Sequence, residues 1–370
     1  MRDRRIRFMV LLLVLALGAS ACRAPEGRDG PGPTASPSET GEDEGSDRAE
    51  DVEPPPVADP NLTGRVGLIV VSNSRTFPRL LGSPSEPGVV VLWVQPDGPS
   101  SGANLQRGDV ITHVNGDPSV NAELAVRQLR ARPGDERRLR VLPAGGGAAR
   151  QVTVTAQNPG NIDVRKDYYQ EMVRETPDDP IVHYLRAQST GPFDENIESA
   201  ERAADLFPGF TEAISLRAEL LFNQSQHREL PVEKVDEFRD RAQRDWRIAL
   251  NQEPTNTRVL VSFAQALAQL GSVRLAHQHA TRAVELDETF PGAHYAVALA
   301  EYTRSRYAAA ARPARRAVDL NPYDVRYYRT LAFTFAKLDR DADARRTADA
   351  ISGLLEPRQR QELYDQLKNV

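Results

Sequence analysis

Serine, aspartate and histidine side chains occur at a few places in this chain where their spacing could support chemistry. The stretch GPSSG at residues 98–102 has the Gly-x-Ser-x-Gly spacing of a nucleophile elbow, which presents a serine for attack on a carbonyl carbon. Such an elbow requires a sharp turn from strand to helix within a large α/β sheet, and the short β-rich runs around these residues predict only a small sheet. We therefore predict that GPSSG is a proline-bearing turn rather than a catalytic site.

The aspartates and histidines do not have the spacing of a metal site. Asp339, Asp341 and Asp343 alternate as in a calcium-binding loop, but no glycine stands at the sixth position that such a loop requires. His277 and His279 are two residues apart on a predicted helix, so they lie on different faces, and no His-Glu-x-x-His motif occurs. We expect no metal, no cofactor and no catalytic residue in this chain.

Composition indicates folded domains and an acidity that is confined to one segment. The 370 residues are 40% hydrophobic, which is enough to form the cores of two or three domains. The formal net charge is -5, but residues 23–62 alone carry eleven acidic residues and three arginines, whereas residues 63–370 sum to zero. A basic surface for nucleic acid is therefore not expected.

The N-terminal residues have the layout of an export signal. Four arginines and one aspartate precede Phe8–Ala21, an uncharged run of fourteen residues that is shorter than the roughly 20 residues of a membrane-spanning helix. Ala19, Ser20 and Ala21 then lead into Cys22, the only cysteine. This arrangement resembles a bacterial lipobox, which implies lipidation of Cys22 and a protein held at the outer face of a bacterial membrane, in the cell envelope. The alternative is an ordinary secretory signal with an unmodified cysteine.

The next segment, residues 22–62, is predicted to be a disordered linker. Eight prolines and five glycines stand between residues 23 and 62, with very few apolar side chains. Such a segment cannot bury enough surface to offset the entropy lost on ordering. Proline and like charges extend it, so we expect a stalk that holds the following domains away from a surface.

Short β-rich runs with turn residues between them occupy residues 63–158. They are RVGLIVV, GVVVLWV, DVITHVNG, RRLRVL and RQVTVT, and one amphipathic helix, SVNAELAVRQLRA, interrupts them. The stretch GVVVLWVQPDGPSSGANLQRGDVITHVNG resembles a PDZ domain of the kind attached to bacterial envelope proteases. The resemblance implies a small mixed α+β barrel, while the catalytic body of such a protease has no counterpart in the sequence.

The PDZ resemblance also implies a binding groove. In that family, a glycine-containing loop exposes backbone amides to a partner's C-terminal carboxylate, and the partner adds as a strand beside the long helix. Gly67 would let the backbone approach the anion, and Leu68 would line the pocket for the last side chain. The alternative is a groove that only packs against the following repeats. The implied peptide-binding residues are Arg65, Val66, Gly67, Leu68, Ile69, Leu124, Ala125 and Val126.

The strand pattern ends before residues 162–370, which predict pairs of amphipathic helices. Three blocks of 34 residues align without gaps and place alanine at equivalent positions, among them Ala276, Ala310 and Ala344. This period resembles the tetratricopeptide repeat (TPR), whose helix pairs stack into a solenoid. Prolines and glycines at regular turn positions count against the alternative of a coiled coil. The predicted repeats are 177–210, 211–256 with a surplus of twelve residues, 257–290, 291–324 and 325–358, followed by a C-terminal capping helix.

The TPR resemblance implies a second binding surface, along the first helix of each pair. Aromatic and arginine side chains there offer contact area and directional hydrogen bonds. The lysines with which some repeats clamp an acidic C-terminus are replaced by Val261, Tyr295 and Arg329, so that specificity is not carried over. The implied residues are Arg258, Gln265, Gln269, Tyr295, Tyr302, Arg326, Arg329, Phe333 and Lys337.

The sequence thus predicts a multidomain protein without enzymatic activity: a signal peptide at 1–21, a linker at 22–62, a PDZ domain at 63–158 and an all-α TPR solenoid at 162–370. The expected function is a lipid-anchored extracytoplasmic adaptor or scaffold that captures peptide segments or C-termini of other proteins. One alternative is a non-catalytic substrate receptor or regulator of a separate envelope protease, and another is self-assembly through the solenoid. Expected partners are other proteins or peptides, such as a membrane protease or secretion or cell-wall machinery, and the membrane itself.

Overall fold

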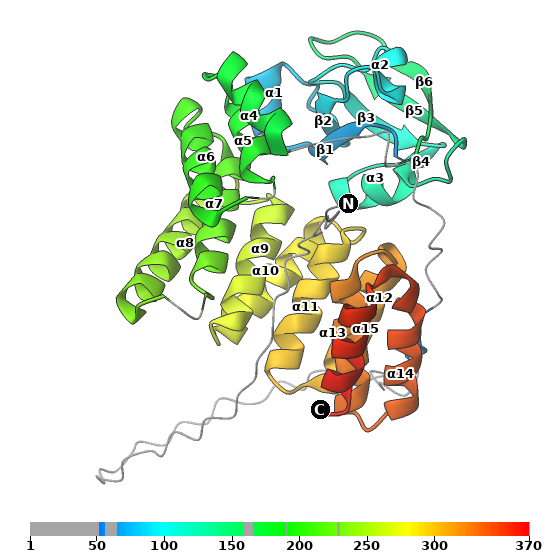
Figure 1. The fold of residues 1–370 in the computed structure, drawn as a ribbon, viewed down its shortest axis with the longest axis vertical. Helices are drawn as coiled ribbons and strands as arrows, with labels where there is room; N and C mark the ends of the chain where they lie inside the picture. The colour runs from blue at the N-terminus through cyan, green and yellow to red at the C-terminus, as the bar shows by residue number, and fades with distance from the viewer. Residues whose placement is uncertain (1–51, 56–64, 159–165, 190, 228–229, 370) are drawn as a thin grey trace, which may run out of the picture. The chain divides into compact units, whose positions relative to one another are not determined.

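The structure is a computed structural model that describes residues 52–55, 65–158, 166–189, 191–227 and 230–369 (Figure 1). The predicted signal peptide, Cys22 and most of the predicted linker lie outside the described residues. Two regions follow, which we call the sheet domain (residues 65–158) and the helical domain (residues 166–369). This order of a small α+β domain and an all-helical domain is the fold class that the sequence predicts.

The sheet domain contains a six-stranded sheet in which every paired strand is antiparallel. The hydrogen-bonded order is β1-β2-β3-β5-β6, and β4 pairs with β3. Because β1 pairs only with β2, its other side is an open edge among the described strands. The strands are β1 (Leu68–Ser72), β2 (Val89–Val94), β3 (Val110–Val114), β4 (Asp117–Pro118), β5 (Glu136–Leu142) and β6 (Arg150–Thr155).

Strand β2 is buried on both faces, because a different layer covers each face. Val89 and Val91 belong to the core formed with α3 (Ala122–Leu129). Val90 and Leu92 belong to a second cluster that includes α1 (Thr76–Leu81) and the first helices of the helical domain. Successive side chains of a strand point to opposite faces, so an uninterrupted apolar run such as VVVLWV suits a strand between two layers.

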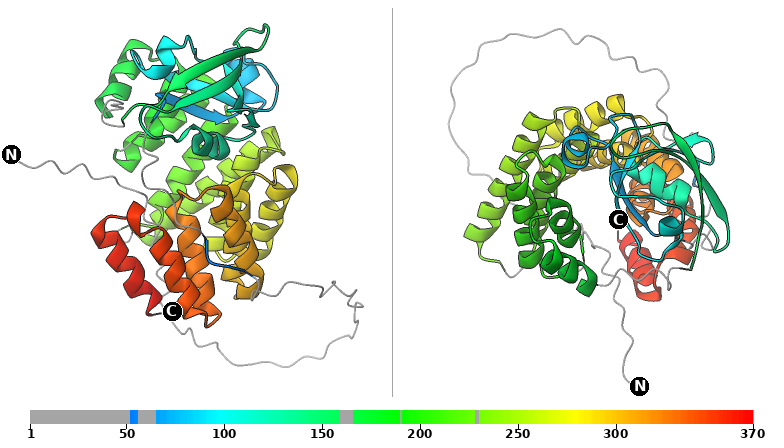
Figure 2. Two further views of the ribbon diagram at one scale, coloured as in Figure 1. Left: turned by 90° about the vertical axis from the view of Figure 1, so that its right-hand side faces the viewer. Right: turned by 90° about the horizontal axis from the view of Figure 1, so that it is seen from above.

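The helical domain is a series of antiparallel helix pairs, which Figures 1 and 2 show laid side by side along a curve. The pairs are α5 (Pro180–Ala187) with α6 (Phe193–Leu206), α7 (Thr211–Gln224) with α8 (Val232–Gln252), α9 (Thr257–Gln269) with α10 (Val273–Leu286), α11 (Pro291–Thr303) with α12 (Tyr307–Leu320), and α13 (Val325–Lys337) with α14 (Asp341–Ala350). Helix α4 (Lys166–Glu175) precedes the first pair. The short helices α2 (Pro99–Gly102) and η3 (Ser352–Leu354) and the last helix, α15 (Pro357–Leu367), complete the fold.

Small buried residues allow the helices to approach one another. Ala276 and Ala280 of α10 and Ala310 of α12 are all fully buried. Ala344 of α14 is 3% exposed. Since alanine adds little beyond the backbone, the apolar faces of neighbouring pairs form a nearly continuous core, as stacking repeats require.

The turns within three successive pairs repeat a left-handed backbone conformation at equivalent positions. The residues are Gly271, Ser305 and Asp339, with φ of 76°, 59° and 57°. Aspartate tolerates this region better than most residues, so Asp339 has a structural reason to be where it is. Asp343 forms ion pairs with Arg340 and Arg346, which agrees with a turn rather than a calcium loop.

The surplus of twelve residues in the second predicted repeat is taken up around the start of α8. This helix has 21 residues, whereas α10 and α12 have 14 each. The extra turns lie at its N-terminal end, where Val232 is 71% exposed. The extension therefore reaches into solvent, as a surplus between two packed helices must.

The described part of the chain has neither a membrane-spanning helix nor a cluster of metal-binding side chains. None of its helices combines the length and the apolar character needed to cross a membrane. No three His, Cys, Asp or Glu side chains of the described residues stand together as ligands of a metal ion would.

Candidate functional site

The turn that leads into β1 is held in a fixed conformation. Gly67 has φ +70°, and a Cβ there would lie 3.0 Å from Oε1 of Gln95. The Gln95 amide donates to the Gly67 carbonyl at 2.9 Å, and the buried Ser100 hydroxyl donates to the Val66 carbonyl. Ser100 is the serine of GPSSG, so its hydroxyl supports this turn and is not an exposed nucleophile. The left-handed conformation and the close approach of Gln95 both require glycine at this position.

Helix α3 packs beside the open edge of β1. Leu68 and Val70 are partly buried against the same core as Ala122 of α3. At the far end of the strand, the Ala122 amide donates to the Ser72 hydroxyl at 2.9 Å, which ties the start of α3 to the end of β1. The edge of β1 and the start of α3 are thus joined by apolar contacts and by one polar contact.

Helix α3 presents three different faces. At 3.6 residues per turn, Ala125 and Leu129 share the face that is buried in the sheet domain, and Glu123 and Arg127 share the face that contacts the helical domain. Val126 lies between these two faces and is 48% exposed. The side chain is therefore accessible beside the contact between the two domains.

The predicted groove residues fall into three groups. Val66, Gly67 and Ala125 are buried, Leu68 and Ile69 are half-buried, and Arg65 and Val126 are exposed. Arg65 forms a backbone bridge with Gln157, so its backbone is part of the sheet domain. Leu124 is half-buried on the side of α3 opposite to Val126, which places it away from the predicted groove.

The outer face of α3 is bound to the turns between successive helix pairs. The Tyr327 hydroxyl donates to the Glu123 carboxylate at 2.6 Å, and Arg127 donates to the Leu320 carbonyl at 2.7 Å. A Cβ at Gly292 would lie 2.9 Å from Oε1 of Glu123, so the glycine makes room for this carboxylate. Burial raises the pKa of the Glu123 carboxyl, although the Tyr327 hydrogen bond and the charge of Arg326 lower it.

Helix α1 forms a second contact with the helical domain. The rings of Phe77 and Phe210 meet edge to face with their centroids 6.1 Å apart, and both side chains are buried. The amide of Arg75 donates to the Glu253 carboxylate at 2.9 Å. Nearby, the Arg107 guanidinium and the Asp179 carboxylate form a two-pronged ion pair. One hydrophobic cluster runs through this contact, so the two domains share a core.

Of the predicted residues on the helical domain, Arg258 has the most unusual surroundings. The Tyr184 phenol first, and then the carboxylates of Glu219 and Glu212, raise the pKa of this guanidinium. Tyr184 is 1% exposed, its hydroxyl has no hydrogen-bond partner, and burial raises its pKa to about 12. Oε2 of the buried Glu212 likewise lacks a partner. Helices α5, α7 and α9 thus bring together polar groups whose hydrogen bonds are not all made within the protein.

The other predicted residues of that surface differ in how much of each side chain is already in contact with the rest of the protein. Arg329 donates to Gln366 of α15 and lies over the ring of Phe333. Arg326 pairs with Asp324, and Tyr295 is 8% exposed. The remaining four are accessible to a larger degree: Gln265, Gln269 and Tyr302 are half-buried, and Lys337 is exposed.

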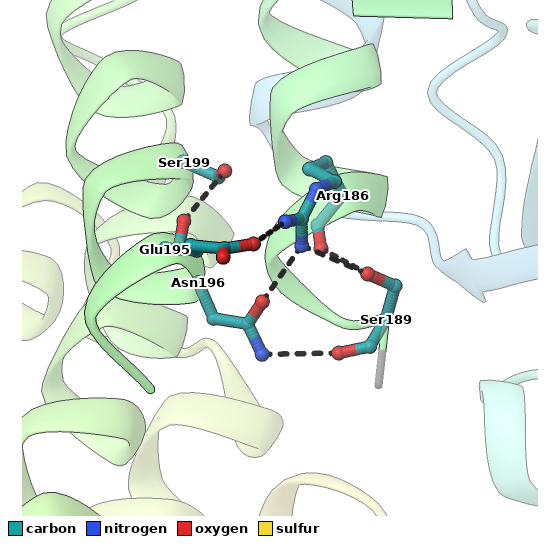
Figure 3. A network of polar contacts seen from close by, with 5 residues as sticks. All are labelled: Arg186, Ser189, Glu195, Asn196 and Ser199. Carbon is teal, nitrogen blue, oxygen red and sulfur yellow. Dashed lines mark hydrogen bonds and ion pairs between the residues drawn. The ribbon is translucent and has the colours of Figure 1, made fainter. Parts of the chain in front are cut away.

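The first helix pair is fastened by a polar network that the sequence did not reveal (Figure 3). Arg186 of α5 is 6% exposed and donates to the carboxylate of Glu195 and to the Asn196 side chain of α6, the latter at 2.9 Å. The Asn196 amide in turn donates to the Ser189 carbonyl at 3.0 Å. Each polar group of this network is satisfied within the pair, so its role is structural.

The residues most engaged between the domains, Glu123, Arg127 and Phe77, were not among the predicted site residues. Glu123 and Arg127 form a charged stripe on α3 that looks like an ordinary solvent-exposed face in the sequence. Phe77 lies on a helix of six residues, which is too short to show a periodic pattern. A conspicuous signal for these contacts is therefore absent from the sequence.

Comparison with known proteins identifies the sheet domain. Residues 64–155 match the PDZ domain family, and this match covers about a quarter of the chain. The chain therefore contains a PDZ domain, which confirms that resemblance, and the all-helical region of TPR-like helix pairs that follows agrees with the predicted fold class. Domains of these two kinds are interaction modules without catalytic machinery. No curated protein sequence matches the chain.

Similar solved structures include two TPR proteins and one protease. A TPR protein of Thermus thermophilus is 19% identical, with a TM-score of 0.41 over 45% of this chain and 88% of that one. YrrB, a TPR protein with an unusual peptide-binding site, is 16% identical, with a TM-score of 0.34 over 54% of this chain and 100% of its own. The HtrA-type protease AlgW, solved with a decapeptide, is 27% identical, with a TM-score of 0.24 over 26% of this chain and 29% of its own.

Proposed function

We propose that this chain is a non-catalytic adaptor that captures the C-terminus of a partner protein in the cleft between β1 and α3. The observation that carries the proposal is the combination of an open edge on β1, the left-handed Gly67 at its start and the 48% exposed Val126 on the opposite wall. An extended peptide would pair with β1 as an additional strand, and its carboxylate would accept hydrogen bonds from the backbone of the Gly67 turn. Leu68 and Val126 would contact its apolar side chains.

The fixed position of α3 favours a ligand that reaches beyond the cleft. Because α3 is bound to the helical domain through Glu123 and Arg127, the cleft and the TPR-like surface have a common border. Upstream residues of a bound peptide would lie near Arg258, which stands beside the Tyr184 hydroxyl and Oε2 of Glu212, two buried groups without a hydrogen-bond partner in the protein. A partner with polar or charged residues before an apolar C-terminus fits both surfaces.

We further propose that the adaptor acts outside the cytoplasm and is anchored through a lipid on Cys22. The support is the sequence alone, in which the only cysteine follows an uncharged run and three small residues. Two acyl chains would give stable attachment, because each buried CH2 contributes about 0.8 kcal/mol. Replacement of Cys22 by serine should move the protein from the membrane fraction to the soluble fraction; unchanged fractionation of the variant would remove the anchor from the proposal.

The cleft is tested with two pools of randomised decapeptides that differ only in a free or an amidated C-terminus. Full chain carrying Cys22→Ser should be retained about tenfold better on the free carboxylate pool, which corresponds to about 1.4 kcal/mol. Gly67→Ala should abolish that preference. Gly116→Ala is the matched control, because Gly116 also has a positive φ, of 96°, but no atom near its substituted Cβ.

A second pair of variants separates the cleft wall from general surface effects. Val126→Glu should weaken retention on the free carboxylate pool, whereas Val232→Glu, at the 71% exposed start of α8, should leave it unchanged. Equal retention on both pools, or a preference that survives Gly67→Ala and Val126→Glu, would refute carboxylate capture by this cleft.

A further inference from the structure

Four residues of the acidic N-terminal segment lie against the last helix pairs. Within 22–62, where the sequence predicts disorder, residues 52–55 have the sequence VEPP and a described position. Val52 is 6% exposed and belongs to the same apolar cluster as Ala311 of α12 and Ala344 of α14. These four residues fall within the predicted linker, yet they have a defined position against the helical domain.

Backbone contacts fix the segment in addition to its apolar side chain. The Arg340 guanidinium donates to the Val52 carbonyl at 2.8 Å, and the Arg315 guanidinium donates to the next carbonyl, that of Glu53. Two prolines follow, and proline favours the extended conformation in which carbonyls point outward for such bonds. Two neighbouring carbonyls are thus recognised by arginines from two different elements of the helical domain.

Space and charge around the segment suit an extended acidic chain. A hollow of about 460 Å³ lies between the segment and Arg312, Arg315 and Arg316 of α12. Another of about 740 Å³ lies between it and Arg340, Asp343, Arg346 and Asp349 beside α14, where the two arginines are balanced by the two aspartates. In the sequence, residues 42–53 carry seven acidic residues and one arginine, so their charge is opposite to that of α12, which carries three arginines and one aspartate.

We propose that this face of α12 and α14 is a binding site for an extended segment with a small apolar residue followed by an acidic residue and prolines. Its occupant is residues 52–55 of the same chain. The consequence is a second connection between the domains, because the chain from Pro55 to Arg65 then links the last helix pairs to the start of the PDZ domain. This proposal uses neither the peptide cleft nor the lipid anchor and can fail independently of them.

The test measures the accessibility of residue 52 in the full chain. Val52→Cys is combined with Cys22→Ser, so that the new thiol is the only one, and its rate of reaction with an aromatic disulfide reagent is recorded. The reference is a synthetic peptide of residues 49–55 with the same Val52→Cys change. We expect the thiol of the folded protein to react at least about tenfold more slowly than that of the peptide, because only a small open fraction exposes it.

Variants of the two arginines connect this protection to the proposed site. Arg315→Ala with Arg340→Ala should raise the rate to within about threefold of the peptide's rate. The control is Arg274→Ala with Arg282→Ala on the exposed face of α10, which should not change the rate. If the double change lowers the helical circular dichroism signal, the single change Arg340→Gln is used, and the rate should still rise at least about threefold.

Three results would overturn the proposal. The first is a folded-protein rate equal to that of the peptide, since the segment would then not be bound. The second is protection that the arginine changes do not affect, since Val52 would then be covered elsewhere. The third is protection that disappears on dilution, since the occupant would then be the segment of a second copy.

Discussion

The shared core between the two domains predicts that they unfold together and that Phe77 holds them together. Phe77 is fully buried and packs edge to face on Phe210. Phe77→Ala should lower the free energy of unfolding by about 3 to 5 kcal/mol, of which the aromatic pair accounts for about 1 kcal/mol. With a urea m-value of roughly 3 kcal/mol/M or more for a body of this size, the midpoint should fall by about 1 M.

The two tryptophans provide a separate probe for each domain. Trp93 lies on β2 of the PDZ domain and Trp246 on α8, and both are buried. Single-tryptophan chains carrying Trp246→Phe or Trp93→Phe should show coincident urea transitions in the parent protein, because one cluster connects the domains. In Phe77→Ala, the Trp93 transition should separate from the Trp246 transition and occur at lower urea.

The matched control is Leu139→Ala, which removes a similar apolar volume from the other face of the sheet. Leu139 is fully buried in the cluster beneath α3 and takes no part in the cluster shared with the helical domain. It should lower stability by about 2 to 5 kcal/mol while the two transitions stay coincident. Separate transitions in the parent protein, or coincident ones in Phe77→Ala, would refute the inference that the shared core couples the domains.

Two further predictions concern carboxylates at the same junction. Burial by itself would raise the pKa of Asp179, but the hydrogen bonds and the charge of Arg107 lower this pKa below its ordinary value of 3.8. The stability that the Asp179 carboxylate contributes is therefore present above pH 3.8 and is lost as the pH falls through the lowered pKa. Asp179→Asn should therefore lower the free energy of unfolding, measured with urea at pH 7, by about 1 kcal/mol. Asp179→Ala should lower it by about 1 kcal/mol more, because only alanine also loses the hydrogen bond that the Ile181 amide donates to this side chain at the start of α5. Equal losses in the two variants would show that the ion pair and the helix cap do not contribute separately. Burial raises the pKa of Glu212, so its contribution is complete below pH 4.5 and is lost as the pH rises through the raised value. Glu212→Gln should flatten the decline of stability with pH above 4.5, and a decline that is unchanged in the variant would show that another group causes it.

The sequence by itself determined the elements of both domains. The apolar run GVVVLWV predicts a strand, and the 34-residue period with alanines at Ala276, Ala310 and Ala344 predicts stacked helix pairs. These signals are local, since the side-chain periods of 2.0 and 3.6 residues record which face of each element is buried. The turn at Gly67 was predicted in another way, from the resemblance to PDZ domains, in which a glycine-containing loop precedes the strand that borders the groove.

Only the tertiary structure decided how the cleft is bounded and where the domains touch. Glu123 and Tyr327 are 204 positions apart, and nothing in either local sequence indicates the hydrogen bond between them. Leu124 and Val126 are equally apolar, yet only Val126 lies at the open side of α3, because the helical domain fixes which faces of that helix are covered. Val52 is buried for a similar reason: its cover comes from α12 and α14, more than 250 residues away, and contacts between such distant residues leave no periodic trace in the chain.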